Sequence, residues 1–239
     1  MTTWYVTTGI SLWESSRCWK LKGIESISTK IDQCTEKELS ADTDGPTLMQ
    51  EWANVRDGIK KIISSANAGD KDSQAQKLVE KYFRKECWAI DRLKALPAEL
   101  ATLCALFQKA MIQTGDTIAF IAGESNKDVA HMLKAMLTAA LNGFPSVIIN
   151  IVGPYALDPT ETDKFNAGVQ KMWGAVQEGT NPKAFVLTGG YKAVLIAIAR
   201  KAPHGTLLFY SHESDPSKLI PLTAQELDIK AGSPLRPSS

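Results

Sequence analysis

The sequence predicts an α/β fold: a Rossmann-like, mostly parallel sheet with helices on both faces, a helical elaboration and a C-terminal hairpin. Short apolar runs of strand length alternate with amphipathic helical patterns, and short turns join them. Only a polar turn separates the last two apolar runs, which is typical of a hairpin. The chain has 239 residues, of which 44% are hydrophobic and 22% charged. These values are ordinary for a globular protein, and the length permits one sizeable core.

The N-terminal part combines one strand with a block of helices. The strand is expected at residues 3–8, and the segment from Glu14 to Pro46 has no clear periodicity. Apolar residues then recur at helical spacing, which predicts three helices between about residues 47 and 113. Pro97 suits the first position of the third helix. Because one helix suffices to connect two parallel strands, we interpret this block as an elaboration packed beside the sheet.

Strands and helices alternate regularly from residue 117 onwards. Further strands are expected at residues 117–121, 147–152, 185–187, 206–210 and 219–222. The run at 147–152 is apolar except for Asn150, as expected for a buried parallel strand. Pro221 is compatible with the last strand because that strand is expected at an antiparallel edge, where proline is tolerated.

Short polar residues indicate where the helices between these strands begin. Ser125 and Asp128 have the spacing of a capping box. In this motif each of the two side chains accepts a hydrogen bond from the backbone N–H of the other residue. Thr160 and Asp163 have the same spacing before the following helix. We therefore expect helix starts at these two pairs.

We expect a single domain over residues 1–230, with the helical insertion at about 47–113 inside it. Residues 231–239 are expected to form a flexible tail, because no apolar pattern continues there. The first residues lack the basic and long apolar stretches of a signal peptide, and the longest apolar runs have strand length. We therefore expect a cytoplasmic protein that does not enter a membrane.

Charge and cysteine usage exclude several classes of site. The net charge of +1 argues against a surface that binds long nucleic acids, which needs a basic stripe. The four cysteines contain no CxxC pair, and with three histidines they show no zinc-ligand spacing. Buried reduced thiols are the expected state of Cys18, Cys34, Cys87 and Cys104. We expect no metal and no cofactor.

A glycine-rich turn follows the strand at 185–187. Thr188, Gly189, Gly190 and Tyr191 lead to Lys192, where an apolar run of helical character begins. Glycines allow a tight turn, and the first N–H groups of a helix have no partner within it. A lysine is unfavourable beside the positive end of a helix dipole unless an anion is bound there too. This turn therefore indicates a phosphate-binding site.

A second turn of this kind follows the first strand. It consists of Thr8, Gly9, Ile10, Ser11 and Leu12. Ligands of open α/β sheets bind at the carboxyl ends of the strands, where the strand order reverses. The two turns are therefore expected to face one crevice.

The two turns resemble the signature turns of CRISPR-associated Rossmann-fold (CARF) domains. The matching stretches are Thr-Gly-Ile-Ser-Leu at residues 8–12 and Leu-Thr-Gly-Gly-Tyr-Lys-Ala at residues 187–193. The last two predicted strands also look like the final hairpin of that family. The resemblance covers the N-terminal strand and residues from about 117 to 225. Many members carry an asparagine a few residues after the serine, whereas this chain continues with Trp13-Glu14-Ser15-Ser16.

The resemblance implies a homodimer that binds a cyclic oligoadenylate, either cyclic tetra-adenylate or cyclic hexa-adenylate, across its two-fold axis. This ring is a second messenger of type III CRISPR antiviral signalling. Some stand-alone family members, the ring nucleases, cut the ring and switch the response off. Cleavage needs no metal, because a ribose 2′-hydroxyl attacks its own neighbouring phosphate and leaves a 2′,3′-cyclic phosphate. We expect an enzyme of this type.

Ser11 and Lys192 are the expected catalytic residues. Ser11 matches the positioning serine of the family, and Lys192 is expected to stabilise charge on the phosphoryl oxygens. Trp13 is open to two interpretations, stacking on an adenine or packing in the core. The residues expected to bind the ligand are Thr8, Gly9, Ile10, Leu12, Trp13, Gly123, Glu124, Ser125, Thr188, Gly189, Gly190 and Tyr191.

Two other functions are compatible with the same sequence. A non-catalytic CARF sensor would hold the ring and pass the signal to a partner, and Ser11 and Lys192 would serve it equally well. An unrelated Rossmann-like nucleotide-binding protein is the other alternative. The residues after the first strand do not fit the GxGxxG pattern of dinucleotide-binding proteins, which disfavours that class.

Overall fold

The computed structural model describes residues 1–14, 45–83, 96–140, 146–188, 192–212 and 215–223. Its centre is a six-stranded sheet with the strand order β3-β2-β1-β4-β5-β6. The first five strands along the chain are parallel, and β6 pairs with β5 in antiparallel orientation. The strands are β1 (Thr3–Thr7), β2 (Thr117–Gly123), β3 (Ile148–Tyr155), β4 (Lys183–Val186), β5 (Leu207–His212) and β6 (Asp215–Thr223). The predicted mostly parallel sheet and C-terminal hairpin are confirmed.

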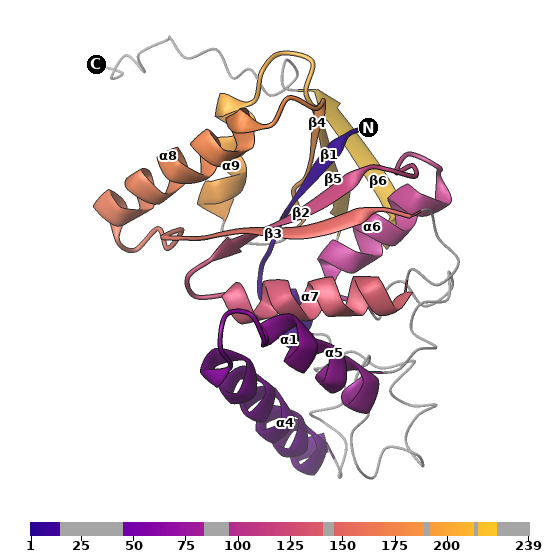
Figure 1. Ribbon diagram of the computed structural model, residues 1–239, viewed down its shortest axis with the longest axis vertical. Helices are drawn as coiled ribbons and strands as arrows, with labels where there is room; N and C mark the ends of the chain where they lie inside the picture. The colour runs from indigo at the N-terminus through magenta and orange to yellow at the C-terminus, as the bar shows by residue number, and fades with distance from the viewer. Residues whose placement is uncertain (15–44, 84–95, 141–145, 189–191, 213–214, 224–239) are drawn as a thin grey trace, which may run out of the picture.

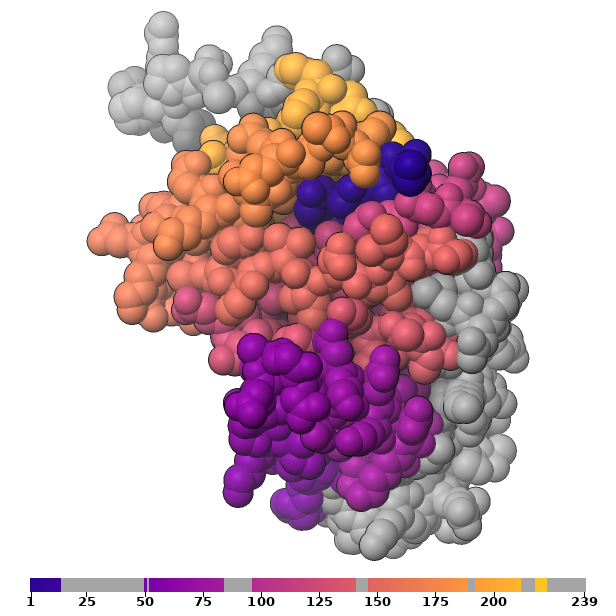
Figure 2. All heavy atoms as spheres, in the orientation of Figure 1, coloured from indigo at the N-terminus to yellow at the C-terminus, as the bar shows by residue number. Residues whose placement is uncertain are grey.

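Helices cover both faces of this sheet. They are α1 (Ser11–Glu14), α4 (Gly45–Ser65), α5 (Lys71–Tyr82), α6 (Ala98–Gln108), α7 (Lys127–Ala140), α8 (Thr162–Glu178) and α9 (Lys192–Lys201). Figure 1 shows α8 and α9 on one side of the sheet and α6 and α7 on the other, with α4 and α5 beyond α7. In Figure 2 the violet α4 and α5 lie at the bottom of the view.

Two hydrophobic cores follow from the alternation of side chains along the strands. Trp4 and Val6 belong to the core shared with α4, α5, α6 and α7. Tyr5, between them in the chain, belongs to the core under α8 and α9, where it stacks on Phe185 at a ring distance of 5.4 Å. A strand buried on both faces is what the central position of β1 requires.

The helical block divides into two parts. α4 and α5 pack against each other and against α7, so they lie beside the sheet domain as expected. The third helix, α6, instead lies on the sheet and contacts β4, β5 and β6. Its sequence, AELATLCALFQ, is almost wholly apolar, and residues 99–107 are buried. A helix that is hydrophobic all round must be enclosed on all sides, which explains its place in the core.

The strand at 147–152 is not buried as predicted. β3 is at the edge of the sheet, with β2 as its neighbour, and each of its residues is either exposed or half-buried. Ile148 is 57% exposed, and Asn150 is exposed as well. Ile149 and Ile151 pack on the core beneath α7. An apolar run therefore did not distinguish a central strand from an edge strand.

Neither predicted capping pair forms. α7 begins at Lys127. The Asp128 carboxylate accepts a hydrogen bond from the Ser64 hydroxyl of α4 at 2.8 Å instead of one from the Ser125 backbone N–H. At α8 the residue before the helix is Glu161, which makes no capping bond through its side chain. The Thr160 hydroxyl donates to Asp158 at 2.7 Å. In both cases the side chains bond other polar groups close by.

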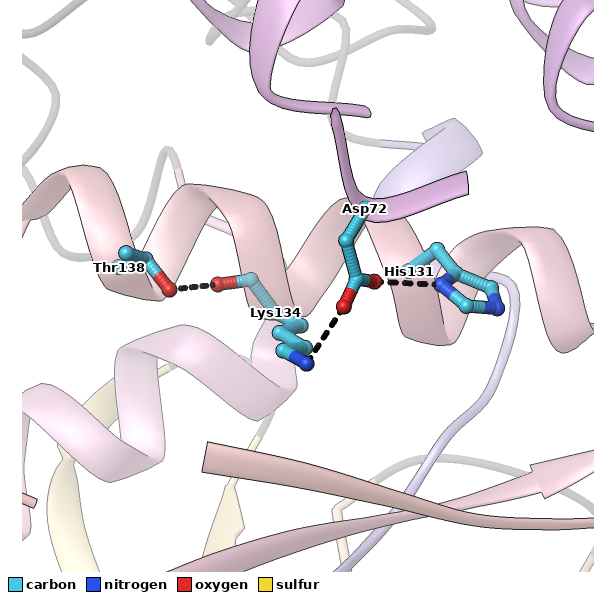
Figure 3. A network of polar contacts seen from close by, with 4 residues as sticks. All are labelled: Asp72, His131, Lys134 and Thr138. Atoms are coloured by element: carbon cyan, nitrogen blue, oxygen red, sulfur yellow. Dashed lines mark hydrogen bonds and ion pairs between the residues drawn. The ribbon is translucent and has the colours of Figure 1, made fainter. Parts of the chain in front are cut away.

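An ion-paired network joins α5 to α7 (Figure 3). The Asp72 carboxylate accepts hydrogen bonds from His131 Nδ1 at 2.8 Å and from Lys134 Nζ at 2.6 Å. Thr138 of the same helix donates to the Lys134 carbonyl at 2.8 Å. Burial opposes ionisation of Asp72, but the bonds from Lys134 and His131 outweigh it and lower its pKa. His131 of α7 therefore pairs with Asp72 of α5.

Asp116 holds the amino end of β1 against the sheet. Its carboxylate accepts hydrogen bonds from the Thr2 N–H at 2.7 Å, from Trp4 Nε1 at 3.0 Å and from the Gln113 N–H at 3.0 Å. The residue is buried. Burial opposes its ionisation, but the hydrogen bonds outweigh this effect and lower the pKa of Asp116.

We predict that Asp116→Asn lowers the free energy of unfolding by about 1–3 kcal/mol at neutral pH, because one amide oxygen replaces two carboxylate oxygens that serve three donors. A lowered pKa stabilises the folded state above the ordinary aspartate pKa of about 4, and this contribution is lost as the pH falls through the lowered value. The difference between the two proteins in urea unfolding should therefore shrink below a pH of about 4. Asp57→Asn is the control, because Asp57 is exposed and pairs with the adjacent Arg56. Equal stability of Asp116→Asn and the unchanged protein at neutral pH would contradict the anchoring role.

We predict that Gly168→Ala destabilises the protein by about 1–3 kcal/mol, since overpacking of a close contact costs this much. A Cβ atom at Gly168 would lie 2.1 Å from the Ala156 carbonyl oxygen, so backbone would have to move. Gly174 of the same helix has no atom within 4 Å of that position, and Gly174→Ala should be neutral or stabilising by up to about 1 kcal/mol. Thermal unfolding of both variants tests this. Equal melting temperatures would refute the close contact.

Candidate functional site

The two predicted turns follow neighbouring strands at the place where the strand order reverses. β1 and β4 lie side by side in parallel, with Val6 opposite Val186. After β1 the chain enters α1, which packs on the α6 and α7 face, whereas after β4 it enters α9 on the opposite face. Ligands of open α/β sheets bind where connections diverge in this way, and the space expected at the carboxyl ends of β1 and β4 is called the crevice below. The strand ends that lead into the two turns lie side by side, and a shared crevice between the turns stays a prediction.

A buried carboxylate of α6 lies beneath the first turn. Glu99 is 0% exposed. Its Oε1 accepts the Gly9 N–H at 2.7 Å, and its Oε2 accepts a short hydrogen bond from the Ser11 hydroxyl. Glu99 thus fixes the turn through one backbone group and one side chain. Burial of a carboxylate is costly unless such donors compensate it.

Glu99 is the residue of the candidate site that sequence reasoning missed. A signal was present, because Glu99 is the one charged residue in α6. Its partners, however, are 88 and 90 residues away in the chain, so spacing alone could not identify them. Ser11 itself is partly exposed at the start of α1. A serine that donates its hydrogen keeps its oxygen lone pairs as acceptors.

The backbone around Thr8 is held by hydrogen bonds to the end of β2. The Thr8 hydroxyl is buried and donates to the Ile121 carbonyl at 2.6 Å. Asn126 Nδ2 donates to the Thr8 carbonyl at 2.7 Å, and Asn126 Oδ1 accepts the Gly123 N–H at 2.6 Å. The Thr8 hydroxyl and the Gly123 N–H thus each donate to a partner within the protein, and the expected ligand contacts of these two residues stay a prediction. Their role is to support the turn.

The side chains after Ser11 enter the core. Leu12 is fully buried, and Trp13 is 6% exposed. Trp13 packs on Trp52 of α4 at a ring distance of 6.4 Å, and its carbonyl accepts Trp52 Nε1 at 3.1 Å. The packing interpretation of Trp13 is thus correct, and neither Leu12 nor Trp13 presents its side chain to a ligand. Ile10, by contrast, is 60% exposed.

The second turn carries a free hydroxyl and a cation. Thr188 Oγ1 is buried and finds no hydrogen-bond partner in the described part of the chain. Lys192 is exposed as the first residue of α9, where the helix presents its positive end. The expected ligand residues Gly189, Gly190 and Tyr191 lie outside the described residues. The described part of this turn thus holds one exposed cation and one buried hydroxyl that has no partner within the described residues.

Glu124 and Ser125 belong to a pocket beside the crevice, at the ends of β2 and β3. The pocket has a volume of about 180 Å³ and is lined by Glu124, Ser125, Ala156, Leu157, Asp158, Glu161 and Lys164. Lys164 is paired with Glu161, which raises the pKa of Lys164, and Glu124 adds to the effect. Three carboxylates around one ammonium group would repel a phosphate. The pocket suits an uncharged or cationic part of a ligand.

The remaining classes of site find no support in the part of the chain that the structure describes. None of its His, Cys, Asp and Glu side chains form a group of three that would hold a metal ion. None of its helices combines the length and apolarity required to cross a membrane. Burial raises the pKa of Cys104 to about 12, so this thiol is protonated and unreactive. The other three cysteines lie outside the described residues.

Comparison with known proteins adds no relative. No protein-family model matches the chain, and no curated protein does. Function is therefore inferred from the residues of the two turns and from what surrounds them.

We predict that Asn126→Ala lowers the free energy of unfolding by about 2 kcal/mol or more, because it leaves the Gly123 N–H and the Thr8 carbonyl buried without partners. Denaturant unfolding measures the loss, and faster hydrogen exchange of the Gly123 amide locates it. Ser125→Ala is the matched control. Ser125 precedes Asn126 in the chain and is exposed, so its substitution should change the free energy of unfolding by less than about 0.5 kcal/mol. If the two variants lose stability equally, Asn126 does not join the two strand ends.

Proposed function

We propose that the crevice after β1 and β4 binds a cyclic oligoadenylate and cleaves it without a metal. The observation that carries this proposal is the position of Ser11 and Lys192, which follow two adjacent parallel strands where their connections diverge. The resemblance of both turns to those of CARF domains supports it independently. The proposal includes a role in ending type III CRISPR signalling, and with it a cytoplasmic location.

The described groups suit this reaction because the nucleophile belongs to the substrate. A ribose 2′-hydroxyl attacks the adjacent phosphorus, and the 5′-oxygen leaves. The protein has to align these atoms and stabilise charge on the phosphoryl oxygens. Lys192 and the Thr188 hydroxyl supply donors on the β4 side. Ser11, held by Glu99, supplies a fixed hydroxyl on the β1 side.

A second copy of the chain is part of the proposal. A ring of four or six identical nucleotides has two-fold symmetry, and a two-fold dimer would offer it two equivalent crevices. The adjacent pocket at the ends of β2 and β3 would then receive an uncharged part of the ring rather than a phosphate.

The deciding experiment incubates the purified protein, with EDTA present, separately with cyclic tetra-adenylate and cyclic hexa-adenylate. We expect linear products that end in a 2′,3′-cyclic phosphate, detected by chromatography and mass spectrometry. An intact ring that co-elutes with the protein would instead identify a sensor. Neither binding nor cleavage of either ring would refute the proposal.

We predict that Lys192→Ala slows cleavage about 100-fold or more, as loss of one charge-stabilising donor does in other enzymes. The melting temperature should not change, because Lys192 is exposed. Arg200→Ala, which removes an exposed cation from the other end of α9, is the control and should cleave at the normal rate. Normal turnover by Lys192→Ala would remove this residue from the reaction.

A further inference from the structure

Glu99 is directed at the first turn rather than at the core that encloses it. Thr102, one turn further along α6, shows the ordinary arrangement of a buried polar group: its hydroxyl bonds the Ala98 carbonyl and Ser211. The two carboxylate oxygens of Glu99 instead accept a hydrogen bond from Gly9 and one from Ser11. A buried carboxylate is more costly than an apolar residue of the same size unless its partners compensate it, and Ser11 is the partner that also reaches the surface.

The Ser11 hydrogen bond has a chemical consequence. A hydroxyl that donates to a carboxylate becomes a stronger acceptor at its own oxygen, because the two bonds polarise each other. Ser11 is partly exposed, whereas Glu99 is not. Ser11 thus connects the buried Glu99 carboxylate with the crevice through one hydrogen bond.

Charge then orients a nucleotide in the crevice. Lys192 and the start of α9 lie on the β4 side and attract phosphate oxygens, whereas Ser11 and Glu99 lie on the β1 side. A phosphodiester is therefore expected on the β4 side. We expect the ribose hydroxyl beside it to face Ser11.

We infer that Glu99 accepts, through Ser11, the proton of the attacking ribose 2′-hydroxyl. This inference rests on the proposed function. As the 2′-oxygen forms its bond to phosphorus, its proton moves to Ser11 Oγ, and the Ser11 hydrogen moves to Glu99 Oε2. The bond between phosphorus and the 5′-oxygen breaks, and the 5′-oxygen leaves with the electron pair and takes a proton from water. Glu99 afterwards returns its proton to solvent through Ser11.

The variant Glu99→Gln separates this role from a structural one. A glutamine has the same shape, and its oxygen can still accept the Gly9 N–H. Its NH₂ group, however, can only donate to Ser11, which reverses that hydrogen bond and removes the proton acceptor. The turn is kept while the proposed proton path is lost.

The test measures equilibrium binding and single-turnover cleavage of cyclic tetra-adenylate and cyclic hexa-adenylate. We expect Glu99→Gln to slow cleavage about 100-fold or more, as loss of a general base does, while Kd changes less than about threefold. Ser11→Ala should do the same, and the double variant should be no slower than the slower single one, since the two residues act as a unit. Thr102→Val is the matched control on the same helix and should cleave normally.

Two outcomes overturn the role of Glu99 and leave the proposed function standing. One is cleavage by Glu99→Gln at the normal rate. The other is a loss of cleavage by Glu99→Gln that is no larger than its loss of binding. If Glu99→Gln does not fold, Ser11→Ala decides, because it keeps the carboxylate and breaks the path. Normal cleavage by Ser11→Ala would then exclude the relay. If the unchanged protein neither binds nor cuts either ring, the proposed function fails and the relay fails with it.

Discussion

The structure depends on the parallel pairing of β1 with β2 on one side and with β4 on the other. This arrangement buries β1 on both faces, so both hydrophobic cores meet along one five-residue strand. It also brings the carboxyl ends of β1, β2 and β4 together, although the end of β1 is more than 100 residues from each of the other two in the chain. Asn126 and the Thr8 hydroxyl strengthen this junction by bonding the backbone where β1 and β2 end. The crevice is thus a product of strand order.

Much of the fold could be predicted from the sequence, because it is encoded locally. The alternation of apolar runs and amphipathic patterns identified the strands, the order of the helices and the C-terminal hairpin. What failed depends on distant contacts. Apolar periodicity alone cannot indicate whether a strand such as β3 has one neighbour or two. Likewise, polar side chains with the spacing of a capping box can bond other partners, as Asp128 does with Ser64.

The candidate site was predicted in part. The positions of Ser11 and Lys192 follow from glycine-rich turns at strand ends, which are local signals. Leu12 was assigned to the ligand as part of the turn that resembles CARF domains, and Trp13 because its ring could stack on an adenine. The first turn of a short helix nevertheless directs both side chains into the core. Glu99 shows the opposite case, a distant residue in contact with Ser11. Sequence proximity and spatial proximity therefore differ within a single turn.

The edge position of β3 has a consequence for the behaviour of the protein in concentrated solution. An edge strand with unpaired backbone groups is a template for sheet extension, and proteins commonly place lysines or other charges there to prevent it. β3, with the sequence IINIVGPY, has no charged residue, and Ile148 is 57% exposed. Pro154 lacks an N–H donor and so interrupts such pairing at one end. The stretch before it is therefore open to self-association through sheet extension, and handling at high concentration should take account of it.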